Sequence, residues 1–191
     1  MVRKDPLSIV GPSGNNAAPP FPTFLAHLFD EKNGAFEVLG GVLASPQEFR
    51  LEVSTADVTR PEPATVFDRD GITVTALGIP HGPMPALAYR VATRGLSVVF
   101  STDQTGTNPR FVPFAKGANV LIMHLAIAAG ATSPLHAAPA VVGRIAQEAG
   151  VGRLIVSHIG QFDLDAALVE LKTAYTGPLT IGADLQCTPV H

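Results

Sequence analysis

Hydrophobic and polar residues alternate along the chain in a way that predicts strands and helices in turn. The strand signals are short runs of β-branched and other apolar residues, separated by turns rich in glycine, proline or charge. These runs are residues 7–10, 49–53, 72–79, 86–93, 96–101, 120–123, 154–156 and 179–181. Apolar residues at helical spacing predict helices over 19–32, 138–149 and 163–173. Because strands and helices alternate in the second half, we expect a layered α/β fold.

Residues able to bind a metal ion stand where three of these strands end. His81 follows the strand over 72–79, Asp103 follows the strand over 96–101, and His158 follows the strand over 154–156. Ligand sites in α/β sheets gather beyond strand ends, and histidine and aspartate are ligands of zinc. Taken singly, however, an aspartate after a strand is typically a turn or cap residue, and a lone histidine is typically a packing or surface residue. Position alone therefore leaves metal binding and a structural role both open.

Composition narrows the classes of partner. Hydrophobic residues make up 46% of the 191 residues and charged residues 15%, which indicates a globular chain with a core and favours one that packs against something else. The net charge is −3 and no run of lysine or arginine occurs, so we expect no nucleic-acid partner. A single cysteine, Cys187, excludes an intrachain disulfide. No apolar stretch has transmembrane length and no signal peptide is recognisable, so we expect a soluble protein of open location.

Five motifs in order resemble the metallo-β-lactamase superfamily, particularly its ribonuclease Z and arylsulfatase-like branch. They are a strand with a Gly-Pro turn, a histidine leading into a Tyr-Arg strand, a strand ending in aspartate, a histidine before a helix, and a strand ending in histidine. In this sequence they are residues 7–12, 81–91, 97–105, 136–139 and 154–159. Thr102 stands where that branch usually has glycine. The resemblance, strongest from Gly71 to Asp184, implies an α/β fold that is part of an αββα sandwich.

The resemblance also implies roles for four residues. His81 would bind a first metal ion, His158 a second, and Asp103 would bridge the two, which are expected to be zinc. His136 would be the catalytic proton donor to the leaving group. A metal-activated water would then hydrolyse an ester-type bond. His124, at the end of the strand over 120–123, is expected to be structural or to support a ligand, whereas His27 and His191 have no motif around them.

Within the superfamily, the sequence favours a small-molecule substrate over transfer RNA. The nuclease branch inserts a long basic arm between the Tyr-Arg strand and the Asp103 strand, whereas only residues 92–95 separate them here. An ester, sulfate ester, phosphoester or lactone all remain open as substrates. The alternative is a chain with no hydrolase activity of its own, either a catalytically inactive truncated remnant or a partner-dependent half-domain. A serine hydrolase has little support, because no Gly-x-Ser-x-Gly elbow occurs.

The motif that defines the family, His-x-His-x-Asp-His, does not occur in the sequence. In relatives it shortly precedes the turn that is Gly11-Pro12 here. We therefore expect residues 1–191 to be a single partial domain, the C-terminal half of the sandwich plus part of its middle. Each metal would then have two ligands, so zinc binding would be weak or partial. Residues 1–54 would cover a sheet surface meant for missing strands, and the chain would form a homo-oligomer or need a missing N-terminal segment.

Overall fold

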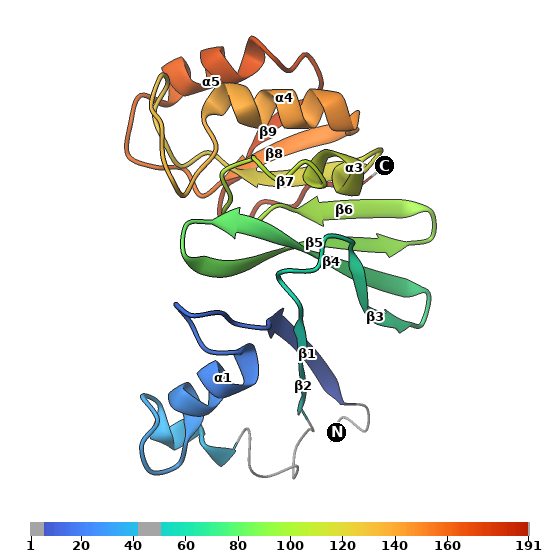
Figure 1. Cartoon of the computed structure of the whole chain (residues 1–191). Helices are drawn as coiled ribbons and strands as arrows, with labels where there is room; N and C mark the ends of the chain where they lie inside the picture. The colour runs from blue at the N-terminus through green and yellow to red at the C-terminus, as the bar shows by residue number, and fades with distance from the viewer. Residues whose placement is uncertain (1–5, 42–50, 191) are drawn as a thin grey trace.

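The computed structural model describes residues 6–41 and 51–190, which form two sheets with helices at opposite ends of the molecule (Figure 1). The larger sheet has seven strands in sequence order, antiparallel from β3 to β6 and parallel from β6 to β9. Its strands are β3 (Ala64–Arg69), β4 (Ile72–His81), β5 (Met84–Thr93), β6 (Leu96–Phe100), β7 (Val120–His124), β8 (Arg153–Ser157) and β9 (Leu179–Ile181). The parallel strands all end at the same edge, so the loops after β6 and β8 leave the sheet side by side.

Three helices cover one face of this sheet and enclose the main core. They are α3 (Phe111–Ala115), α4 (Pro139–Ala149) and α5 (Leu164–Lys172). Leu121 and Leu154 of the parallel strands are fully buried against this layer, as is Val142 of α4. The near-continuous apolar runs of β7 and β8 are typical of parallel strands in a buried sheet.

A second, smaller layer packs against the opposite face of the sheet. β1 (Leu7–Pro12) and β2 (Leu51–Ala56) pair in parallel, and α1 (Phe21–Phe29) and the short 3-10 helix η1 (Glu37–Leu39) lie beside them. Alternation along β4 and β5 separates the two cores: Leu77 and Ala88 face the main core, whereas Ala76 and Leu87 face β1–β2. The Tyr89 hydroxyl ties the layers together by donating to the carbonyl of Val10 at 3.0 Å.

The expected α/β fold with αββα layering is confirmed, and the predicted elements match closely. The helix predicted over 138–149 is α4, which begins with Pro139 and ends at Gly150 (φ 61°), whose amide bonds the carbonyls of Ala146 and Gln147. The strand predicted over 179–181 is β9 without change. The predicted run over 49–53 is described only from Leu51, since residues 42–50 lie outside the described part of the chain.

The sequence patterns did not predict three of the described elements, β3, α3 and η1, for different physical reasons. β3 has a register shift between Thr65 and Phe67, and a bulge breaks the apolar–polar alternation by which strands are recognised. α3 and η1 are too short to show a helical period. Helix α1 is shorter than the predicted 19–32, and Phe24 of its supposed apolar face is 47% exposed. None of the helices in the described ranges is long and apolar enough to cross a membrane.

Candidate metal centre

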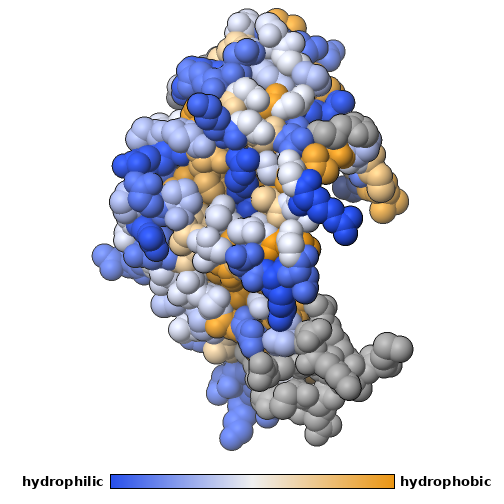
Figure 2. Space-filling model, turned by 90° about the vertical axis from the view of Figure 1, so that its right-hand side faces the viewer, coloured by the Kyte–Doolittle hydropathy of each residue, from blue (hydrophilic) through white to orange (hydrophobic). Residues whose placement is uncertain are grey.

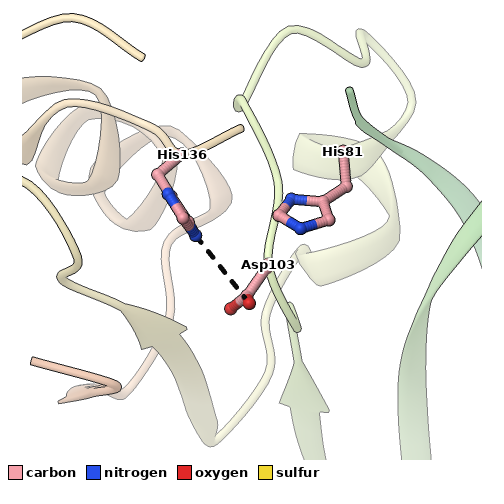
Figure 3. A group of neighbouring side chains, drawn as sticks. All are labelled: His81, Asp103 and His136. Atoms are coloured by element: carbon pink, nitrogen blue, oxygen red, sulfur yellow. Dashed lines mark ion pairs between the residues drawn. The ribbon is translucent and has the colours of Figure 1, made fainter. Parts of the chain in front are cut away.

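The four residues singled out in the sequence meet at the edge of the sheet where the parallel strands end. His81 is the last residue of β4, Asp103 lies in the loop after β6, His136 lies just before α4, and His158 directly follows β8. Figure 3 shows His81, Asp103 and His136 pointing toward one another from these separate segments. The structure thus brings all four side chains together at one edge of the sheet.

Asp103 is the centre of the cluster. Its Oδ2 lies 3.3 Å from His158 Nε2 and 3.8 Å from His136 Nε2. One potential ligand atom each of His81, Asp103 and His136 lies within 4.8 Å of the other two. His158 is not part of that tighter group of three, although the His136 and His158 ring centroids are 5.5 Å apart. The structure thus brings the expected proton donor, His136, as close to His81 as a ligand would be.

The chemistry of these side chains fits a divalent metal ion. The Nε2 atom of His136 is buried and has no hydrogen-bond partner among the described residues. The alternative is an ion-pair cluster without metal, in which His158 and His136 face Asp103 at 3.3 Å and 3.8 Å. Neutral imidazole nitrogens and a carboxylate oxygen are the ligand set of zinc and similar ions.

His81 is held in the tautomer that a metal ligand needs. Its Nδ1 lies 3.0 Å from the carbonyl oxygen of Leu135. Since a carbonyl only accepts, Nδ1 must carry the proton and donate it. The lone pair of Nε2 is thereby left free for a ligand, the usual arrangement of metal-binding histidines.

His124 lies behind the cluster and is fully enclosed. It is 2% exposed, and burial lowers the pKa of its imidazole to about 4. Its Nδ1 lies 3.0 Å from the carbonyl oxygen of Thr102, and its Nε2 lies 3.1 Å from the amide nitrogen of Ala137. The structure therefore places His124 as a support for neighbouring loops. Its partners are backbone groups, which no residue pattern could have identified.

The backbone is strained beside two of the four residues. Thr102 has a φ of 50° and His158 a φ of 47°. A β-branched residue is a true outlier in this left-handed region, at a cost of about 1–3 kcal/mol. Thr102 is held there by its side chain, which donates to the carbonyl of Leu87 at 2.8 Å. This is the position at which the sequence suggested that relatives carry glycine.

Two hollows flank the cluster. One, of about 430 Å³, is lined by His136 together with the hydroxyl-bearing side chains of Thr105, Thr107, Thr132 and Ser133. No acidic or basic side chain other than His136 lines it in the described part of the chain. The other, of about 150 Å³, has Asp103, His124 and His158 among its lining residues. His136 and Asp103 thus each border a hollow.

Comparisons with known proteins bear on the fold of the chain and on part of its sequence. No family model matches the chain. A probable metallo-hydrolase of Bacillus subtilis (strain 168), YhfI, is 34% identical over 112 residues, which are 57% of this chain and 45% of the relative. The chain thus spans about half the length of the curated relative that it matches.

Solved structures extend the likeness over nearly the whole chain. The crystal structure of the metallo-β-lactamase fold protein YhfI superposes with a TM-score of 0.64 at 23% identity, covering 92% of this chain and 61% of that one. The short form of human tRNase Z gives 0.70 at 17% identity, covering 98% and 68%. A diphosphatase of the PhnP family gives 0.61 at 14% identity, covering 94% and 56%. The chain has the metallo-β-lactamase fold, and over 112 residues its sequence is similar to that of one probable metallo-hydrolase.

Proposed function

We propose that this chain belongs to a metal-dependent hydrolase that cleaves an ester-type bond in a small molecule. His81, Asp103 and His158 are the metal ligands in this proposal, and His136 is the proton donor. The observation that carries it is the convergence of three imidazoles on one carboxylate at a strand-end edge. Zinc is the proposed metal, in two positions bridged by Asp103, with weak or partial binding by this chain alone.

The surroundings of each side chain support these proposed roles. Bound metal would supply Lewis acidity and would lower the pKa of a water molecule toward neutrality. Asp103 lies close to both proposed histidine ligands, with a carboxylate oxygen within 4.8 Å of a His81 ring nitrogen and Oδ2 3.3 Å from His158 Nε2, which suits a bridging carboxylate. The neutral ring of His81 offers the lone pair of Nε2 to a metal ion, because its Nδ1–H donates to the carbonyl of Leu135. His136 lines the larger hollow, where its ring is placed to give a proton to a departing oxygen.

The larger hollow bears on the substrate. Threonine and serine hydroxyls line it, and His136 is the one ionisable side chain among its described walls. Such a wall suits an uncharged group with hydroxyl or carbonyl oxygens better than a highly anionic one. The part of the substrate that leaves with the help of His136 is therefore proposed to be uncharged. Ester, sulfate ester, phosphoester and lactone bonds remain open for the bond that is cleaved.

A substrate panel with matched variants tests the function. The chain, dialysed against a chelator and reloaded with Zn²⁺ or Mn²⁺, is assayed on p-nitrophenyl acetate, p-nitrophenyl sulfate, bis-p-nitrophenyl phosphate and a lactone. Turnover should require metal and fall about 100-fold or more in Asp103→Asn, since both metal positions share that carboxylate. His27→Gln, in exposed helix α1, is the histidine control and should change nothing.

Zinc binding separates the two roles open to His136. As a proton donor, it can be changed to asparagine with loss of turnover but little loss of zinc affinity. As a ligand, which its closeness to His81 and Asp103 would also allow, its loss weakens zinc binding as much as His81→Asn does. Zinc bound without turnover of any substrate would contradict the hydrolase proposal and favour an inactive or partner-dependent module.

A further inference from the structure

His124 connects the two loops that carry Asp103 and His136. Its Nδ1 bonds the carbonyl of Thr102, the residue before Asp103, and its Nε2 bonds the amide of Ala137, the residue after His136. The histidine itself ends β7, an interior strand that lies between β6 and β8. A buried ring thus joins an interior strand to a backbone group adjacent to each of two site residues.

The direction of both hydrogen bonds follows from their backbone partners. The carbonyl of Thr102 only accepts, so His124 must donate from Nδ1. In the neutral ring, Nε2 is then unprotonated and accepts from the amide of Ala137. One tautomer therefore satisfies both loops. The opposite tautomer would place a ring N–H against the amide of Ala137 and a bare ring nitrogen against the carbonyl of Thr102.

The bond to Thr102 acts on a strained residue. Thr102 has a φ of 50°, a conformation that a threonine leaves unless its surroundings hold it. Two hydroxyl bonds also act at this residue: Thr102 Oγ1 donates to Leu87, and Ser101 Oγ donates to the Thr102 carbonyl. The angle of this residue decides the direction in which the chain presents Asp103.

We propose that His124 is a positioning residue that holds Thr102 in its left-handed conformation, and thereby aims Asp103 at His136 and His158. The inference rests on the proposed metal-binding role of Asp103. His124 touches neither substrate nor metal in this assignment. It acts through the backbone on either side of the cluster.

A purely structural role for His124 would be the alternative, and the surrounding bonds distinguish the two. The amide of Ala137 also donates to the carbonyl of Gln104 at 2.8 Å. This second bond keeps the two loops together when His124 is replaced, so the fold should survive. What is lost is the hold on Thr102, and with it the aim of Asp103.

The test measures Zn²⁺ affinity by competition with a chromophoric chelator. His124→Leu removes both hydrogen bonds and keeps an apolar side chain, whereas His124→Gln keeps one donor and one acceptor. His124→Leu should weaken zinc binding about 10- to 100-fold, the usual effect of losing a residue that orients a ligand. His124→Gln should lie between this variant and the wild type, and His27→Gln should match the wild type.

A second substitution tests the route through Thr102. Glycine adopts the left-handed conformation without strain, so Thr102→Gly should no longer need His124 to hold it. The loss of zinc affinity on adding His124→Leu should therefore be at least several-fold smaller in the Thr102→Gly background. Equal losses in both backgrounds would overturn the proposed route, as would wild-type zinc affinity in folded His124→Leu.

Nitrogen-15 NMR of the imidazoles gives a readout that needs no metal. His124 should show a protonated Nδ1 and a bare Nε2 at neutral pH, and His124→Gln should shift the amides of Asp103 and His136. The opposite tautomer, or unshifted amides, would overturn the inference even if His124→Leu failed to fold. A wild-type chain that bound no zinc would contradict the proposed function alone, and these spectra would still decide the role of His124.

Discussion

Thr102 combines a side chain that resists the left-handed conformation with a hydroxyl that supports it. The strain and the hydrogen bond to Leu87 have opposite signs and similar size, about 1–2 kcal/mol each. Which of them dominates cannot be seen from the wild type, because both are always present. Two substitutions at this one position separate them.

Thr102→Gly should leave the free energy of unfolding within about 1 kcal/mol of the wild type, because relief of strain offsets the lost hydrogen bond. Thr102→Val should be destabilised by about 1–2 kcal/mol, because valine keeps the β-branch and loses the hydroxyl. Urea unfolding of the three proteins measures this. A glycine variant less stable than the valine variant would show that the conformation at Thr102 carries little strain.

His124 should make the chain sensitive to mild acid. Burial lowers its pKa to about 4 in the folded protein, against about 6.5 in the unfolded chain. Between these values the unfolded state binds more protons, so stability falls as the pH falls through that window. Between pH 7 and pH 5 the wild type should lose about 2 kcal/mol more than His124→Gln. The unfolding free energy of both proteins is measured by urea unfolding at the two pH values. An equal loss in the wild type and in His124→Gln would contradict this prediction.

Among the elements, helix α4 depends on its neighbour for its start. Its own N-cap residue, Ala138, has no side chain able to cap. Glu170 of α5 takes that role: one carboxylate oxygen accepts from the amide of Ala140 at 3.1 Å, and the other accepts from Gly130 at 2.6 Å. Because α4 begins just after His136, this carboxylate also anchors the segment that carries His136.

Glu170→Ala should therefore lower the free energy of unfolding by about 1–2 kcal/mol, since it removes a cap and a bond to an ionised group. Glu148→Ala is the matched control. Glu148 is paired with Arg144 one turn away on the exposed side of α4, and such pairs contribute less than about 0.5 kcal/mol. Thermal and urea unfolding of both variants give the comparison. Equal losses would show that the Glu170 carboxylate is no more than a surface charge.

Sequence patterns predicted the helices and strands well where the local spacing of apolar residues decides the secondary structure. The continuous apolar runs of β7 and β8 and the Gly150 stop of α4 were all recognisable. Contacts between segments that are distant in the sequence could not be predicted in this way. The bulge in β3, the cap that Glu170 supplies and the bonds of His124 to backbone groups exist only once the chain has folded. For the cluster, the sequence therefore indicated which residues converge, but not what holds them in place.

At the scale of the whole molecule, the two layers differ in how firmly they are built. The helices and the seven-stranded sheet enclose the main core, whereas β1–β2 meets the sheet through a small group centred on Ala56, Ala76 and Leu87. Phe36 and Val38 of the small layer are 53% and 90% exposed. Residues 1–54 were predicted to cover a sheet surface meant for missing strands, and residues 1–5 and 42–50 of that range lie outside the described part of the chain. On the face shown in Figure 2, hydrophobic residues lie in separate areas among hydrophilic ones.

This contrast predicts an order of local opening, measurable by hydrogen exchange. Amides of β7 and β8 should be the best protected, because both strands are paired on two sides and buried by α4 and α5. Amides of β1 and β2 should exchange about 10- to 100-fold faster, because a two-stranded sheet is marginal by itself. Uniform protection across both layers would mean that the chain opens as one cooperative unit.

The way in which the cluster is distributed along the chain has a consequence for folding kinetics. From His81 to His158, each of the four side chains belongs to a different stretch. The parallel pairings of β6, β7 and β8 lie between Asp103 and His158. Non-local pairings of this kind form late, because their loops must close before any contact compensates the lost entropy. Partly folded chains therefore hold the imidazoles apart, and the complete group exists only after β8, which positions His158, has docked on β7. Capture of an ion at this edge would thus report that the strands from β4 to β8 are in place.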